Sequence, residues 1–264
     1  FVKRTIMKIL FVLLFILKAF IGLSNVYAIN NIHDNNYMDG GFQCIESLPI
    51  LTFQQLTRGG DGYLYGAAYL NMHQQHSLGN IYRLSTDGSD YKIMHKFSML
   101  NGINPNATLT IGPDGSLYGT TLRGGKYGFG TLFKLNIDGQ FKKIHEFSRD
   151  EGANPATPLV LVNNKILYGM TQNGGKNNYG TIYTIDSNES YKKIYDFDKV
   201  NGMAPDAATL LIGPNNSLYG TTIGGGKNGF GVIFKISYVS CKSGMFNATS
   251  LFKLKQIAYI NPAN

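Results

Sequence analysis

The sequence predicts an all-β protein, a β-propeller of four four-stranded antiparallel blades, with one blade for each repeat of about 50 residues. The tripeptide Leu-Tyr-Gly occurs four times, and its tyrosines lie 53, 50 and 51 residues apart, at Tyr65, Tyr118, Tyr168 and Tyr219. Asp-Gly or Asn-Asn pairs separate short runs rich in Thr, Ile, Leu, Phe and Tyr, which is the pattern of β-hairpins. Frequent glycine and proline argue against helices after residue 28.

The second repeat shows the predicted elements in order. Residues 117–121, 131–135 and 141–147 are expected strands, and the glycine-rich stretch 124–130 joins the first two. One blade cannot bury both of its faces alone, so blades must stack, with recurrent leucine and aromatic side chains between them. These residues are Leu117 and Phe133, Leu167 and Tyr183, and Leu218 and Phe234. The repeated tyrosines are likewise interpreted as packing residues.

Residues 1–28 have the pattern of a cleaved secretory signal. Basic residues precede an apolar run at 9–17, and Val26-Tyr27-Ala28 resembles the site that a signal peptidase cleaves. A membrane anchor is the alternative, but the run is short for a span of about 20 residues and Lys18 interrupts it. We therefore expect an exported protein (periplasmic, at the cell surface or secreted) with no stable membrane span after cleavage.

The remaining chain divides into three predicted parts. Residues 29–48 are an N-terminal segment and a candidate closing strand, residues 49–240 hold the blades, and residues 241–264 are a C-terminal strand or a degenerate tail. The expected blades cover residues 49–99, 100–149, 150–199 and 200–240. The tail leaves a fifth blade open as an alternative. A homo-oligomer is expected if the ring of blades is incomplete.

The charge of the chain excludes one class of partner. The predicted signal contains four basic residues and no acidic residue, so its loss lowers the net charge from +8 to +4. A modest excess without a long basic run is not the electrostatic footprint of nucleic-acid binding. We therefore expect no nucleic-acid partner.

The two cysteines flank the repeats. Cys44 precedes the first repeat and Cys241 follows the fourth. The two ends of a closed ring of blades meet, so a disulfide between these residues would clasp the ring, and export permits its formation. Two unpaired, buried thiols are the alternative, because the sequence does not supply the Cα separation that a disulfide requires.

The repeats resemble the GloVer tandem repeat of exported bacterial proteins, which reads approximately D-G-x-L-Y-G-T-T, then G-G, G-x-G-T and F-K-L. The match is best over residues 104–147 and 206–236, whereas the first repeat has Ala67-Ala68 in place of Thr-Thr. The resemblance implies an exported, propeller-like protein, often with a separate surface anchor, and it implies no activity. A weaker similarity to virginiamycin B lyase and NHL-type propellers depends on the turn at 112–117.

The glycine-rich loops provide the main candidates for ligand binding. Lys126, Lys176 and Lys227 follow Gly-Gly at the same place in three repeats, and Arg123 precedes the first of these pairs. If the loops share one rim, their ammonium groups and free backbone N–H groups would form a surface suited to anions or acidic sugars. The alternative is that glycine permits the turn and lysine solvates it.

Histidines and carboxylates give weaker indications. His73 and His76 form an H-x-x-H pattern in the divergent loop of the first repeat and are further candidates for ligand binding. Zinc needs a third ligand, so we predict no metal site and no cofactor. His95 and His145, at equivalent positions, are interpreted as structural. Acidic residues of the outer strands, such as Glu146 and Asp196, are interpreted as ordinary sheet surface.

These patterns favour binding over catalysis. No Ser-His-Asp spacing or Gly-x-Ser-x-Gly elbow occurs, and the sequence identifies no catalytic residue. The first hypothesis is a non-catalytic module that presents a rim of loops to a glycan, peptide or protein. The alternatives are a propeller enzyme of the lyase or lactonase type, which would use His73 or His76, and a purely structural surface repeat.

Overall fold

The computed structural model describes residues 55–68, 78–205, 209–239 and 251–259. The chain divides into two compact units, Phe1–Pro49 and Ile50–Asn264, and all of the described residues belong to the second. Several predictions therefore fall outside the described residues: the signal at 1–28, the segment 29–48, the pairing of Cys44 with Cys241, and the placement of His73 and His76.

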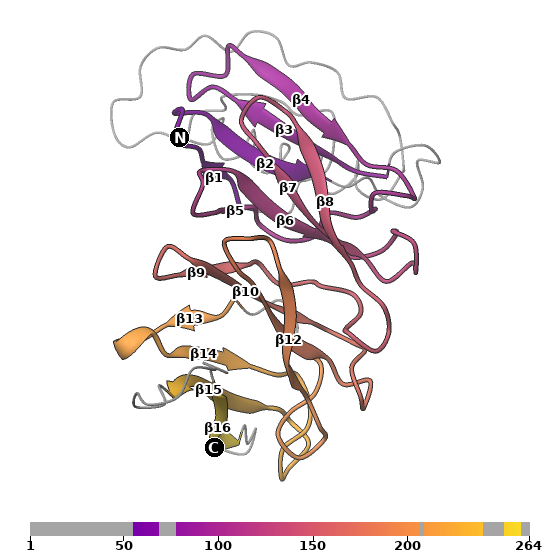
Figure 1. Ribbon diagram of the computed structural model, residues 1–264, viewed down its shortest axis with the longest axis vertical. Coiled ribbons are helices and arrows are strands. Elements are labelled where there is room, and N and C mark those ends of the chain that lie inside the picture. Colours follow the sequence, from indigo (N-terminus) through magenta and orange to yellow (C-terminus); the bar gives the residue numbers. More distant parts are fainter. Residues whose placement is uncertain (1–54, 69–77, 206–208, 240–250, 260–264) are drawn as a thin grey trace, which may run out of the picture. The chain divides into compact units, whose positions relative to one another are not determined.

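The described residues form four sheets of four strands (Figure 1). The first sheet contains β1 (Thr57–Arg58), β2 (Leu64–Ala68), β3 (Asn80–Leu84) and β4 (Tyr91–Lys96). The second contains β5 (Thr110–Ile111), β6 (Leu117–Thr121), β7 (Thr131–Leu135) and β8 (Phe141–Glu146). The third contains β9 (Val160–Val162), β10 (Ile166–Thr171), β11 (Thr181–Ile185) and β12 (Tyr191–Asp196). The fourth contains β13 (Leu211–Ile212), β14 (Leu218–Thr221), β15 (Val232–Val239) and β16 (Leu251–Tyr259), with the 3₁₀ turn η1 (Pro214–Asn216) between β13 and β14.

Each sheet is an antiparallel meander whose strands follow one another in chain order. This confirms the predicted fold class: the sheets are β-propeller blades, and we number them 1 to 4. The segment 251–259, which the sequence left open as a strand or a tail, supplies the outer strand of blade 4. No helix among the described residues is long and apolar enough to span a membrane.

The meander gives every blade two distinct ends. The glycine-rich connection between the second and third strands and the segment leading to the next blade lie at one end, which we call the loop end. The hairpin turns between the first and second strands and between the third and fourth strands lie at the other end, which we call the turn end. Leu-Tyr-Gly begins the second strand of each blade, and this strand runs from the turn end to the loop end.

The glycine of Leu-Tyr-Gly is required by the aromatic residue opposite it. Gly119 pairs with Phe133 on the neighbouring strand, and a Cβ atom at Gly119 would lie 2.5 Å from the Phe133 ring. The same pairing joins Gly169 to Tyr183 and Gly220 to Phe234. The aromatic ring thus lies over the backbone of the glycine. This contact explains why glycine and an aromatic residue occur together at this pair of positions in each blade.

Three hydrophobic clusters join successive blades. The cluster between blades 2 and 3 contains Tyr118, Leu132 and Phe147 from blade 2 with Leu167 and Tyr183 from blade 3. Equivalent residues join blades 1 and 2 and blades 3 and 4. We call the face that a blade turns toward the next blade its far face, and the opposite face its near face. The predicted packing of leucine and aromatic side chains between blades is confirmed.

The equivalent histidines of the outer strands also lie between blades. The imidazole of His95 in blade 1 stacks on Phe141 of blade 2, with ring centroids 3.7 Å apart, and His145 stacks on Tyr191 of blade 3 at the same distance. Burial lowers the pKa of His95 to about 4 and also lowers the pKa of His145. Both histidines are therefore neutral packing residues near pH 7, as the sequence predicted.

Candidate ligand-binding loops

The loops that carry Lys126, Lys176 and Lys227 have the same conformation in blades 2, 3 and 4. The first two residues of each are glycines with positive φ, +82° and +76° at Gly124 and Gly125, a region that favours glycine. A Cβ atom at Gly124 would lie 2.9 Å from the backbone of Gly102 in the segment that leads into blade 2. Close contact between two backbones therefore explains the Gly-Gly pair, and the three lysines that follow are exposed.

A carboxylate of the outer strand holds each of the first two loops. Glu146 Oε1 accepts a hydrogen bond from the backbone N–H of Lys126 (2.9 Å), and Asp196 Oδ1 accepts one from that of Lys176 (2.8 Å). Lys143 donates to the same oxygen of Glu146, and its hydrogen bond, with that of the loop, holds the pKa of this carboxyl below its ordinary value. The interpretation of Glu146 and Asp196 as ordinary sheet surface was wrong, because both residues position a loop.

The expected set of free backbone donors is also wrong. The N–H of Gly125 donates to Met99 O (2.9 Å), that of Gly128 to Gly125 O (3.2 Å), and that of Gly130 to Gly124 O (3.1 Å). The loop of blade 3 repeats this pattern. Most of the donors are therefore used to stabilise the loop, and the exposed lysines remain as cationic groups at the loops, beside other exposed side chains such as Tyr127.

Paired threonines lie directly beneath the loops of blades 2 and 3, whereas in blade 4 Val232 replaces the second threonine. Thr121 Oγ1 and Thr131 Oγ1 are 2.9 Å apart and buried, and Thr131 also donates to the backbone oxygen of Asn101 (2.9 Å). Thr171 and Thr181 form the same pair in blade 3, at 2.8 Å. In the first repeat Ala68 and Asn80 occupy these positions. The Thr residues of the repeat motif are thus structural and are not available to a ligand.

Blade 4 carries its loop with a different support. Val232 pairs in register with Tyr259, at the position where Glu146 and Asp196 provide carboxylates in blades 2 and 3. Arg123 is exposed at the loop of blade 2. The equivalent residues in blades 3 and 4 are Asn173 and Gly224, so only blade 2 has a cation at this position among the three. Within the described part of the chain, Lys126, Lys176 and Lys227 form no ion pair with a carboxylate.

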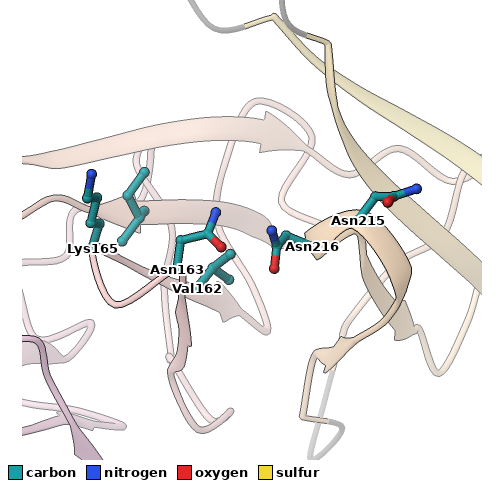
Figure 2. Close-up of a pocket in the computed structure, with 6 residues that line it drawn as sticks. Val162, Asn163, Lys165, Asn215 and Asn216 are labelled. Carbon is teal, nitrogen blue, oxygen red and sulfur yellow. The ribbon is translucent and has the colours of Figure 1, made fainter.

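A second candidate site lies at the turn end, between blades 3 and 4 (Figure 2). It is a pocket of about 240 Å³ with Val162 and Ile166 as apolar lining. Its polar side chains are Asn163 and Lys165 from the β9–β10 turn and Asn215 and Asn216 from η1. None of these four has a side-chain hydrogen bond or ion pair with another described residue. This pocket could not be predicted from the sequence, because its asparagines read as ordinary turn residues: Asn163, Asn215 and Asn216 have φ near +55°, which asparagine tolerates.

Blades 2 and 3 have a charged cluster at the same end. Lys134 Nζ lies 2.6 Å from Asp114 Oδ2 and 2.8 Å from Glu189 Oε1, and Lys142 also pairs with Glu189. Hydrogen bonds from the two lysines hold the pKa of Glu189 below its ordinary value. Glu189 belongs to blade 3 and both lysines belong to blade 2, so the cluster joins two blades and leaves no charge for a ligand.

The histidines with a predicted ligand role cannot be placed, because His73 and His76 lie outside the described residues. In the ranges that the structure describes, no group of three or more His, Cys, Asp or Glu residues could hold a metal ion. The described candidates for ligand binding are therefore the three loop lysines with Arg123 at the loop end, and the asparagine-lined pocket at the turn end.

The repeated blades and their loops define a class of tandem-repeat β-propeller proteins. The family model described as the Gloeobacter/Verrucomicrobia repeat matches residues 52–260. The chain therefore belongs to this repeat family, as the GloVer motif predicted. No curated protein matches the chain in sequence.

Several solved structures are similar to this chain. TolB from Acinetobacter baumannii is 14% identical with a TM-score of 0.47, and the match covers 82% of this chain and 46% of that chain. A gluconolactonase from Xanthomonas campestris is 15% identical with a TM-score of 0.42, covering 63% of this chain and 52% of that chain. A putative gluconolactonase is 10% identical with a TM-score of 0.48, covering 77% and 62%. This chain spans less than two thirds of each of these proteins.

Proposed function

We propose that this protein is an exported, non-catalytic binding module that recognises an acidic glycan through the lysine loops of blades 2, 3 and 4. The observation that carries the proposal is the repetition of one rigid loop. At the same end of three successive blades, the chain presents an exposed lysine after Gly-Gly, and in blades 2 and 3 an outer-strand carboxylate holds the backbone of that lysine. The signal-like sequence at residues 1–28 supports export.

The rigidity of the loops favours binding. Glu146 and Asp196 fix the backbone of Lys126 and Lys176, so little conformational freedom of the backbone remains to be lost when a ligand binds. The lysine side chains are exposed and form no ion pair with a described residue. An anionic ligand therefore need not displace an internal carboxylate partner.

The spacing of the loops favours an extended ligand. Consecutive blades are joined by continuous hydrophobic clusters, so the lysines belong to neighbouring repeats of one stacked array. A chain of uronic acid units carries a carboxylate on each sugar and can contact several lysines at once. Simultaneous contacts raise the overall affinity even when each contact is weak.

The test is binding of the purified protein to alginate, an anionic polysaccharide, and to a glycan array. We expect the triple substitution Lys126→Ala, Lys176→Ala and Lys227→Ala to weaken alginate binding at least about tenfold, since three charged contacts are lost. Binding should also weaken as salt concentration rises. An unchanged binding profile for the triple variant would refute the proposal.

A matched control separates recognition from overall charge. Lys92, Lys192 and Lys255 are exposed at equivalent positions of the outer strands and form no ion pair with a described residue, so replacing all three by alanine removes the same charge from another surface. This control should bind alginate nearly as well as the unmodified protein. Equal loss in both variants would mean that net charge alone causes binding.

The pocket at the turn end requires a separate comparison. Asn163→Ala with Lys165→Ala removes an amide and an ammonium group from its lining and leaves the loop end unchanged. If the loop lysines carry recognition, this double variant retains alginate binding. Loss of binding in this variant alone would move the site to the pocket and overturn the proposal for the loops.

A further inference from the structure

The turn end of blade 3 departs from the repeat at the residue that lies under the repeated tyrosine. The other three blades have glycine at this position, and a Cβ atom there would lie within 2.6 Å of the tyrosine ring; these residues are Gly59, Gly112 and Gly213. Blade 3 has Val162 instead. Its side chain excludes a tyrosine ring from this place, and the pocket between blades 3 and 4 lies against Val162.

The two turns beside the pocket have also lost the aspartate of the repeat. In blades 1 and 2 this residue is used within the blade, since Asp61 accepts a hydrogen bond from the Tyr65 hydroxyl (2.7 Å) and Asp114 pairs with a lysine (2.6 Å). Blades 3 and 4 have Asn164 and Asn215 at this position. The departures of both blades from the repeat thus meet at one pocket, and local departures of this kind are expected at functional sites.

The pocket presents amide groups from both blades. In Figure 2 the amides of Asn163 in blade 3 and Asn216 in blade 4 point toward each other from the two turns. Neither side chain forms a hydrogen bond with another described residue. The apolar lining is rigid, because Val162 and Ile166 belong to the hydrophobic cluster that joins blades 3 and 4. A ligand between the two turns could therefore bond to both blades above an apolar floor.

The chemistry of the lining favours hydroxyl groups over anions. A carboxamide has an acceptor oxygen beside its N–H donors, and a hydroxyl group both donates and accepts, so the two are complementary. An anion only accepts, and it would leave the amide oxygens unpaired. The pocket volume of about 240 Å³ is below the range of about 300–1,000 Å³ for sites that hold drug-sized ligands. This size suits one sugar ring, whose C–H face can contact Val162 and Ile166.

We infer that this pocket binds one neutral pyranose sugar, either free or at the end of a glycan, between Asn163 and Asn216. The exposed ammonium of Lys165 adds a donor for a hydroxyl group. The inference goes beyond the proposed function, because the ligand is neutral and the loop lysines at the other end of the blades have no part in it.

Titration with D-glucose, D-galactose and D-mannose, followed by ligand-detected NMR, tests the inference. We expect at least one of these hexoses to bind with a Kd on the order of 1 mM, as for a small ligand with few contacts. Asn163→Gly with Asn216→Gly should weaken this binding at least about tenfold, because it removes the amides of both blades. Glycine is chosen because φ is +53° and +55° at these positions, so the turns should keep their conformation.

Asn164→Gly is the matched control. It removes an amide from the same turn, also at φ +53°, but Asn164 does not line the pocket, so hexose binding should be unchanged. A disaccharide that ends in the bound hexose distinguishes the two sources of the sugar, since tighter binding of the disaccharide indicates the end of a glycan and equal binding indicates the free sugar.

Three outcomes would overturn the inference: no hexose binds, the control weakens binding as much as the double variant does, or D-glucuronate binds more tightly than every hexose. Alginate binding by the double variant is measured in parallel and should be unchanged. Failure at the pocket is therefore distinguishable from failure of the proposal for the loop lysines.

Discussion

At the scale of single residues, most of the repeat motif is committed to structure. The aspartate and glycine form the turn, the tyrosine packs between blades, the next glycine lies under an aromatic ring, and the threonines pair beneath the loop. The lysine after Gly-Gly has an exposed side chain in all three copies, whereas the exposed residue that follows it varies (Tyr127, Asn177 and Asn228). This is the physical reason to assign recognition to the lysines rather than to the more numerous aromatic residues.

The glycine under the aromatic ring gives a test at this scale. Gly119→Ala would force the buried Phe133 ring to move, and overpacking of this kind costs about 1–3 kcal/mol. We expect this decrease in the free energy of unfolding, measured by urea denaturation. Gly60→Ala is the control, because nothing lies within 4 Å of a Cβ atom there, and its effect should stay within about 0.5 kcal/mol. Equal effects of the two substitutions would contradict the proposed role of Gly119.

At the scale of elements, the outer strands hold blades together through neutral histidines. Asn101 Nδ2 lies 3.2 Å from His95 Nε2, and Glu151 Oε2 lies 3.6 Å from His145 Nε2. Burial opposes protonation of both rings, although Glu151 and Glu146 partly favour the charged form of His145. In the unfolded chain the two imidazoles are exposed to water and take up a proton more easily. Acid should therefore favour the unfolded chain and weaken the contacts between blades.

The sign of this effect follows from linkage. The pKa of His95 falls from an ordinary value of 6.5 to about 4 on folding, so between these pH values the unfolded chain binds the extra proton. This contribution to stability is present above about pH 6.5, decreases as the pH falls toward 4, and levels off below. We expect the double variant His95→Tyr with His145→Tyr to lose less stability than the unmodified protein between pH 7 and pH 4, measured by urea denaturation.

The substitution to tyrosine is chosen from the protein itself. Blade 3 has Tyr195 at the equivalent position, where its ring lies edge-on to Phe197 as the histidine rings lie to Phe97 and Phe147. Tyrosine should therefore preserve packing while it removes the titrating group. Identical pH profiles for the two proteins would show that these histidines do not contribute to acid sensitivity.

The sequence predicted the elements well and their tertiary partners less well. Strands, turns and the packing between blades follow from local patterns, because periodic residues and turn residues act within one repeat. The role of Glu146 at the loop depends on a residue 20 positions earlier, Lys126, and the pairing of Lys134 with Glu189 joins residues 55 positions apart. Glu146 and Asp196 are acidic residues at the same position of two repeats, and this agreement is a signal that could have indicated their role. Glu189 has an acidic residue at its position in one blade only and gives no such signal.

At the scale of the whole molecule, the predicted disulfide would act on the array of blades as a unit. Cys44 and Cys241 precede and follow the main part of the repeats, so a bond between them would close a loop of nearly 200 residues. Closing a loop of this size stabilises by about 5 kcal/mol in the chain-entropy account. We expect mass spectrometry of a non-reduced digest to find the linked peptides, and reduction to lower the unfolding temperature. Two free thiols in protein recovered from an oxidising compartment would refute this prediction.

The contact between one blade and the next has a consequence for how such chains change in length. Each interface is made by neighbours alone and repeats the same chemistry, so an extra copy of one repeat, inserted at a repeat boundary, would meet a compatible surface on both sides. Gene duplication can therefore lengthen the array without redesign of its core, and each added copy of repeat 2, 3 or 4 would bring one more lysine to the loop end.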